Sequence, residues 1–238
     1  MTRHESKPPD GRPPLPIARL ARLFERTGYI FQGAARRLRR RFAGPGKAPL
    51  TIAIVMPLTG AAANWLQGIK FDWLDRYGVS RGLEAAPHVT LKMGCQVREL
   101  APIAQYLGQL AAQTDAPTIG MQDAGRFPDG VMFLDVATTP PLDRLRRRIV
   151  ADLQDQFGIV PEELEGDGFH FHATIGFGLP TAACDAEYQR LQAGSHTFVE
   201  TASAMEIWVH VGANWAPYFR APFKAPPQMN DVSCGHHG

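Results

Sequence analysis

Two tetrapeptides in this chain share one pattern, in which a histidine, a small apolar residue, a threonine and a branched apolar residue follow one another. They are His88-Val89-Thr90-Leu91 and His172-Ala173-Thr174-Ile175. Because successive side chains of a β-strand point to opposite faces, the histidine and threonine of each motif would share one face, and the apolar residues would face a core. The pattern predicts two half-buried strands, each of which presents an imidazole and a hydroxyl group to one side.

The sequence around the two motifs also repeats. Each motif is preceded by an apolar, strand-like segment and a helical stretch, and is followed by a further helix and a strand. The expected segments are 52–57, 61–77, 99–113 and 117–123 around the first motif, and 131–136, 142–157, 181–193 and 197–201 around the second. The repetition predicts an α+β fold in which one module, strand–helix–motif strand–helix–strand, occurs twice.

The composition fits one folded domain with extensions. A chain of 238 residues, 45% of them hydrophobic, can bury a sizeable core. Its three cysteines are widely spaced and form no C-x-x-C pair, which is typical of reduced thiols rather than of a disulfide framework. No stretch reaches the ~18 apolar residues of a membrane span, and the first residues lack the apolar segment of a secretory signal. We therefore expect a cytoplasmic protein.

The charge is distributed unevenly along the chain. Residues 1–47 contain twelve lysines and arginines against three acids, a net charge of +9, whereas the remaining residues contain 13 basic and 20 acidic side chains, a net charge of −7. We expect a basic N-terminal arm (1–47), partly disordered and with an amphipathic helix over 17–42, a folded domain (48–225) and a flexible tail (226–238). A basic amphipathic helix fits RNA, an anionic membrane surface or the acidic domain as its partner, and a solvated arm without a dedicated partner stays open as an alternative.

The paired motifs resemble those of the two-histidine (2H) phosphoesterase superfamily, which includes the 2'-5' RNA ligase-like proteins and the RNA 2',3'-cyclic phosphodiesterases. The resemblance covers residues 50–223 and implies a bilobal fold in which two antiparallel sheets face a central cleft, with helices outside. It implies that His88 and His172 are catalytic and that Thr90 and Thr174 bind phosphate. Many relatives have an arginine shortly after the second motif, where this chain has Gly176-Phe177, and Lys92 is the candidate phosphate-binding cation in its place.

The resemblance implies a metal-independent phosphodiesterase that opens 2',3'-cyclic phosphates, or cleaves 2'-5' linkages, of RNA ends or small nucleotides. One imidazole would act as the base and the other as the acid, because an ordinary histidine pKa near 6.5 makes both forms accessible near neutrality. The resemblance favours His172 as the base and His88 as the acid. We expect no cofactor, and a monomer whose partner is a nucleotide or an RNA end.

Two alternative functions remain open from the residues alone. His170 and His172 have the spacing of a metal-ligand pair, so a metal-dependent hydrolase is possible if a third ligand exists elsewhere. Without a metal, we expect His170 to support the site from its edge. The other alternative is a nucleotide- or RNA-binding module without catalysis, which would share the fold and the motifs.

Overall fold

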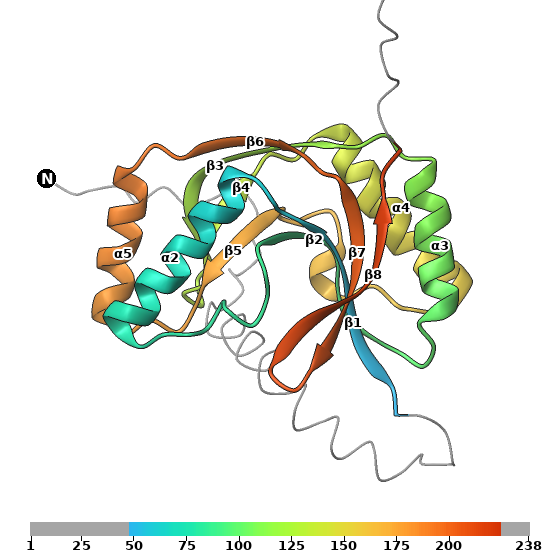
Figure 1. Cartoon of the computed structure of the whole chain (residues 1–238), viewed down its shortest axis with the longest axis horizontal. Coiled ribbons are helices and arrows are strands. Elements are labelled where there is room, and N and C mark those ends of the chain that lie inside the picture. The colour runs from blue at the N-terminus through green and yellow to red at the C-terminus, as the bar shows by residue number, and fades with distance from the viewer. Residues whose placement is uncertain (1–47, 225–238) are drawn as a thin grey trace, which may run out of the picture. The chain divides into compact units, whose positions relative to one another are not determined.

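The computed structural model describes residues 48–224 (Figure 1). The predicted basic arm (1–47) with its helix (17–42), and the predicted tail (226–238), lie outside the described residues. None of the described helices is long and apolar enough to cross a membrane.

Eight strands form two four-stranded antiparallel sheets. The first sheet has the order β2-β1-β7-β8 and the second has the order β5-β4-β3-β6. The strands of the first sheet are β1 (Leu50–Pro57), β2 (His88–Val97), β7 (Ala204–Val211) and β8 (Asn214–Pro222). Those of the second are β3 (Thr118–Arg126), β4 (Met132–Val136), β5 (His172–Gly176) and β6 (Thr197–Thr201).

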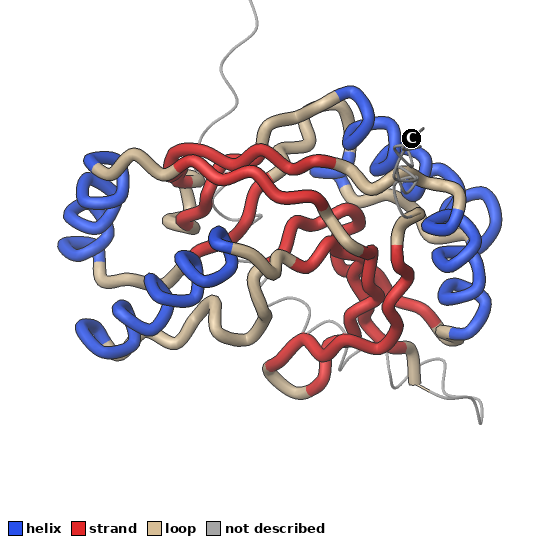
Figure 2. The backbone as a smooth tube through the Cα atoms, turned by 45° about the horizontal axis from the view of Figure 1, so that its top comes forward, coloured by secondary structure: helices blue, strands red, loops and turns tan. Residues whose placement is uncertain are grey.

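Within residues 48–224, four α-helices flank the two sheets, and a short 3₁₀ helix, η1, lies before the second motif. They are α2 (Ala61–Tyr77), α3 (Ala101–Ala112), α4 (Pro140–Phe157), η1 (Glu163–Glu165) and α5 (Thr181–Ala193). Helices α3 and α4 contact strands of the first sheet, whereas α2 and α5 contact strands of the second. Figure 2 shows the helices on the outer sides of the strands. Each sheet is thus covered by one helix from each half of the chain.

The order of elements matches the predicted repeat, but the pairing of strands exchanges parts of the two modules. Strand β3 ends the first module and yet joins β4 in the second sheet, and β6 pairs with β3. The first sheet is completed by β7 and β8, an antiparallel pair that the repeat did not predict. The two modules therefore form one interlocked unit, because neither sheet is built from one half of the chain alone.

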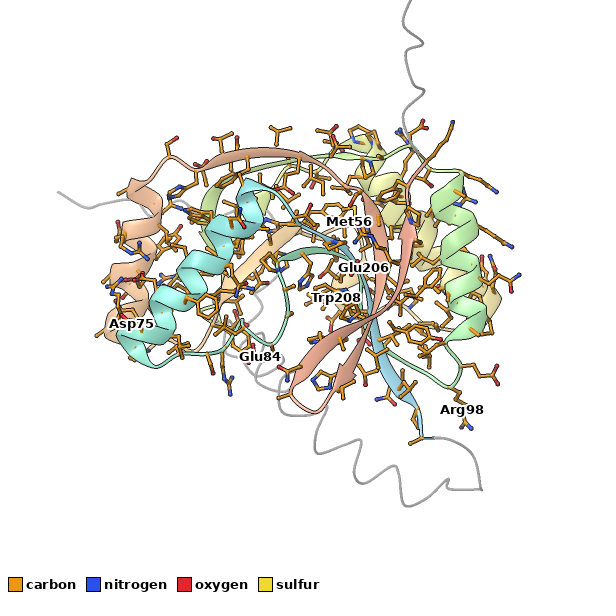
Figure 3. All side chains as sticks on the ribbon, viewed as in Figure 1. Met56, Asp75, Glu84, Arg98, Glu206 and Trp208 are labelled. Atoms are coloured by element: carbon orange, nitrogen blue, oxygen red, sulfur yellow. The ribbon has the colours of Figure 1, made fainter. Side chains whose placement is uncertain are left out.

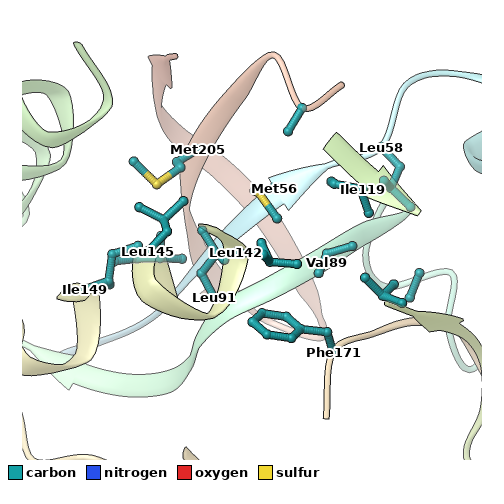
Figure 4. Close-up of a cluster of buried hydrophobic side chains, with 14 of the residues drawn as sticks. Met56, Leu58, Val89, Leu91, Ile119, Leu142, Leu145, Ile149, Phe171 and Met205 are labelled. Atoms are coloured by element: carbon teal, nitrogen blue, oxygen red, sulfur yellow. The ribbon is translucent and has the colours of Figure 1, made fainter. Parts of the chain in front are cut away.

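The apolar positions of both motifs lie in the core, as their alternation predicted. Val89, Leu91, Ala173 and Ile175 are fully buried, whereas the histidine and threonine of each motif are only partly buried. Figure 4 shows Val89 and Leu91 of β2 in a buried cluster with side chains of α4, including Leu142 and Leu145. Phe171, just before β5, belongs to the same cluster and is 1% exposed.

Candidate active site

The two motif strands are the outer strands of their sheets at adjacent edges. Strand β2 ends the first sheet, β5 ends the second, and these two strands contact each other. A charge on His172 contributes to lowering the pKa of His88. The fold thereby brings together two histidines that are far apart in the sequence.

The two imidazoles are held in the same way. Nδ1 of His88 lies 2.7 Å from the carbonyl oxygen of Ala86, and Nδ1 of His172 lies 2.8 Å from that of His170. Because a carbonyl oxygen only accepts hydrogen bonds, Nδ1 carries the proton in each neutral ring, and Nε2 is left as the basic nitrogen. Both motifs therefore use the carbonyl two residues before the histidine to direct Nε2 away from the backbone.

Burial lowers the pKa of both histidines. The pKa of His88 falls to about 4, first because the protonated ring loses water, and further because Lys70 and His172 add positive charge; the bond to Ala86 opposes the shift. The pKa of His172 is lowered mainly by burial as well, with a further contribution from the charge of His170, while the His170 carbonyl and Asp135 oppose it. The free protein thus holds His88 neutral near pH 7, in a form that accepts a proton.

On the first sheet, the face that carries His88 and Thr90 continues through the apolar Val55 to the polar side chains of Glu206 and Arg220. Val55 pairs with Thr90 on one side and with Glu206 on the other, and Glu206 pairs with Arg220, so these residues share one face. Glu206 accepts hydrogen bonds from Trp208 Nε1 and from Arg220, each at 2.6 Å. Figure 3 labels Glu206 and Trp208 on β7.

Trp208 contacts the first histidine directly. Its ring centroid lies 4.7 Å from that of His88, with the rings inclined by 62°. Trp208 is buried and its indole N–H is fixed by Glu206, so it forms a rigid wall beside the imidazole. The sequence analysis did not identify Trp208 as a residue of the site.

On the second sheet, two phenylalanines surround the second histidine. The ring centroids of Phe127 and Phe133 lie 5.0 and 5.3 Å from that of His172, and 5.5 and 5.1 Å from that of His170. His170 is itself held by Asp135, whose Oδ1 lies 2.7 Å from Nε2. These contacts place His170 beside His172, at the edge of the candidate site.

The metal alternative requires a third ligand next to His170 and His172. Among residues 48–224, no three histidine, cysteine, aspartate or glutamate side chains are grouped as a metal-ligand set. The Asp135 carboxylate, which lies beside this pair, is hydrogen-bonded to His170. The geometry of the described residues therefore does not supply the ligand set on which that alternative depends.

The expected phosphate contact of Lys92 is corrected by the register of β2. Thr90 pairs with Val55 but Lys92 pairs with Ile54, so a β-bulge inserts one residue between them and turns both Leu91 and Lys92 toward the core. The Lys92 Nζ lies 2.7 Å from Glu165 Oε2, and both side chains are 0% exposed. Strand alternation would place Lys92 with His88 and Thr90, and the bulge removes it from that face.

A different lysine lies beside the first histidine. Lys70 is buried on α2, and its Nζ donates a hydrogen bond to the carbonyl of Ala85 at 3.1 Å. The carbonyl of the next residue, Ala86, holds His88. The sequence carried a signal for Lys70, since this charged residue occupies the helical stripe whose other members are apolar: Ala62, Ala63, Leu66 and Trp73.

Of the two residues that follow the second motif, Gly176 and Phe177, the first has no room for a side chain. A Cβ on Gly176 would lie 2.7 Å from the carbonyl oxygen of Arg81 and 3.0 Å from the ring of Trp73. In the facing segment, Gly82 has φ +110°, and a Cβ there would lie 2.7 Å from the carbonyl oxygen of Ile175. The segment before the first motif and the end of β5 thus pack backbone to backbone.

The two antiparallel sheets and their paired His-x-Thr strands define the class of protein. A sequence profile of the 2'-5' RNA ligase superfamily matches residues 59–214, and the chain belongs to this superfamily. A solved structure of E. coli LigT in complex with 3'-AMP has 16% sequence identity and a TM-score of 0.52, with 74% of this chain and 99% of LigT covered. The protein TT0787 of Thermus thermophilus has 14% identity and a TM-score of 0.50, with 73% and 98% covered. These two structures share the fold of this chain, and a search of curated proteins gave no match.

Proposed function

We propose that the protein is a metal-independent phosphodiesterase that opens 2',3'-cyclic phosphates, or cleaves 2'-5' linkages, of RNA ends or small nucleotides. The observation that carries this proposal is the pair of imidazoles, each with Nδ1 bound to a backbone carbonyl and Nε2 available, on two neighbouring strands. Two such groups are what a phosphodiester requires, because one proton has to be removed and another supplied.

In the proposed reaction, one Nε2 takes a proton from the attacking water. The water oxygen bonds to phosphorus, the bond from phosphorus to the leaving ribose oxygen breaks, and the other imidazole gives its proton to that oxygen. Thr90 and Thr174 share the faces of the two histidines, and their hydroxyls would donate hydrogen bonds to the non-bridging oxygens, where negative charge increases.

The lowered pKa values add a condition to this scheme. The imidazole that acts as the acid has to be protonated at the start of the reaction, yet burial favours the neutral form of both. An anionic phosphate between them would favour the charged form and raise the pKa of the ring that it contacts. In the assignment that the resemblance implies, His88 is the acid, so its pKa has to rise from about 4 when the substrate binds.

A nucleotide is the substrate class that the neighbouring groups favour. E. coli LigT has been solved with 3'-AMP, and this chain has the same fold. Phe127 is partly exposed beside both His170 and His172, and an aromatic ring next to the catalytic pair can stack on a base. The expectation of a nucleotide or an RNA end as the partner is therefore retained in the proposal.

The test is a substrate panel assayed with purified full-length protein in excess EDTA. The panel comprises 2',3'-cyclic mononucleotides, 2'-5'-linked dinucleotides and RNA that ends in a cyclic phosphate, with 2'- and 3'-monophosphate products separated. We expect turnover of at least one member in EDTA. Activity that EDTA abolishes and zinc restores would support the metal alternative, and saturable binding without turnover of any member would support the non-catalytic one.

A further inference from the structure

Lys70 is a buried cation with only part of its bonding capacity used. The side chain is 4% exposed, and one hydrogen bond of Nζ, to the Ala85 carbonyl, is found. Within the part of the chain that the structure describes, Nζ forms no ion pair, whereas Lys92 and Lys224 are paired with Glu165 and Asp115. Burying an ammonium group without a carboxylate partner costs free energy, so a lysine in this state is a candidate for a binding or catalytic role.

The position of Lys70 links it to the candidate active site. Its Nζ and the His88 ring are bonded to the carbonyls of consecutive residues, Ala85 and Ala86. Its charge contributes to lowering the pKa of His88. Helix α2, which carries Lys70, also contacts β5, the strand of His172. Lys70 thus lies beside the segment that positions His88.

We propose that Lys70 binds the substrate phosphate beside His88 and takes the role that the sequence suggested for Lys92. This inference rests on the proposed function for the identity of the substrate, but it requires only that the site binds a tetrahedral anion. The ammonium group has three donors, of which the Ala85 carbonyl uses one. The other two are available to the non-bridging oxygens of a phosphate held between the histidines, as charge-assisted hydrogen bonds.

The charges around Lys70 make this binding dependent on pH. Glu84, in the segment before β2, favours the charged lysine; His88 of β2 lies next to it, and His172 of β5 faces His88. Burial outweighs Glu84 and lowers the pKa of Lys70 to about 8. Lys70 is therefore charged at pH 7 and loses its charge as the pH rises through 8, unless a bound anion raises its pKa.

Sulfate is a suitable probe, because it is a tetrahedral anion whose charge is constant at neutral and alkaline pH. Binding is followed in the full chain by the NMR shifts of the His88 imidazole, which report this site and not the basic residues of 1–47. Lys70→Met keeps the length of the side chain without its charge and should weaken sulfate binding about 10- to 100-fold, as expected for charge-assisted hydrogen bonds. It should also raise the pKa of His88, which confirms that the lysine charge acts on this ring, whereas the sulfate affinity decides whether Lys70 binds the anion. Lys70→Arg should retain affinity within a few-fold.

The control is Lys224→Met, which removes an exposed lysine and should change neither quantity. A folded Lys70→Met protein with wild-type sulfate affinity would overturn the inference, whatever the pKa of His88. If Lys70→Met does not fold, the sulfate affinity of the wild-type protein is measured as a function of pH instead. This affinity should decrease between pH 7 and 9.5 as Lys70 loses its charge, and a constant affinity would contradict the proposal. Sulfate binding needs no turnover, so Lys70-dependent binding in a protein that hydrolyses nothing would support this inference and reject only the proposed reaction.

Discussion

Replacing Lys92 by methionine separates a structural role of this residue from a role in phosphate binding. The substitution leaves the Glu165 carboxylate buried, with the backbone N–H groups of Met93 and Glu162 as its remaining donors. Both members of the pair are 0% exposed and lie 2.7 Å apart, and removing one partner of such a pair costs about 3–5 kcal/mol. A domain of this size loses about 2–4 °C in Tm per kcal/mol, so we expect a decrease of about 6–20 °C.

The assay compares thermal unfolding with steady-state kinetics on a cyclic mononucleotide, below the unfolding transition. The folded fraction of Lys92→Met should retain KM and kcat within a few-fold, because the lysine does not reach the face of His88. Adding Glu165→Gln should recover part of the lost stability, since no unpaired carboxylate is then buried. A KM that rises tenfold or more in Lys92→Met with unchanged thermal stability would refute this reasoning and reinstate Lys92 as a phosphate ligand.

Three further outcomes are expected. Gly176→Ala should destabilise the protein by about 1–3 kcal/mol in denaturant unfolding, because the added methyl group meets the Arg81 carbonyl and the Trp73 ring. The control, Gly168→Ala, has open space around it and should not destabilise the protein. Equal effects of the two substitutions would contradict the close packing at Gly176. The pKa of His88 in the folded protein is about 4, below its value in the unfolded chain, so its contribution to stability is present above about pH 6.5 and is lost as the pH falls through 4. The free energy of unfolding, measured between pH 4 and 7, should therefore depend less steeply on pH in His88→Gln than in the wild type. An unchanged slope would contradict the lowered pKa of His88. Deleting residues 1–47, with net charge +9, should leave the rate of hydrolysis of a cyclic mononucleotide within a few-fold of the wild type. The deletion should weaken the binding of longer RNA and reduce the salt dependence of that binding. An equal loss of activity on both substrates would show that these residues belong to the folded domain.

The alternation of polar and apolar residues within each motif predicted much of the fold, because each motif strand has one face in the core. It identified the buried residues Val89 and Ala173 and the partly exposed His88 and His172. The same rule failed at Lys92, since a bulge depends on the register with β1, which the pattern of one strand does not contain. Strand partners were unpredictable for the same reason: periodicity reveals a strand, but not that β3 joins the sheet of the second module.

The parts of the site that the sequence interpretation missed come from other elements than the motifs. Lys70 belongs to α2 and Trp208 to β7, and only the tertiary fold brings them to His88. The sequence nevertheless contains a signal for each of these residues. Lys70 interrupts an apolar helical stripe, and Glu206 interrupts an apolar strand two residues before Trp208. A charged residue in an otherwise buried pattern was thus the signal that the motif search did not use.

The central claim is that His88 and His172 act together as acid and base, and kcat/KM of the single and double alanine variants tests it most directly. Measured in EDTA on the best substrate of the panel, each single variant should lose several orders of magnitude in kcat/KM while remaining folded. The double variant should be little worse than either single one, because residues that act as a unit are strongly non-additive. A His172→Ala or His88→Ala protein that keeps near-wild-type turnover would contradict the two-histidine mechanism for this chain.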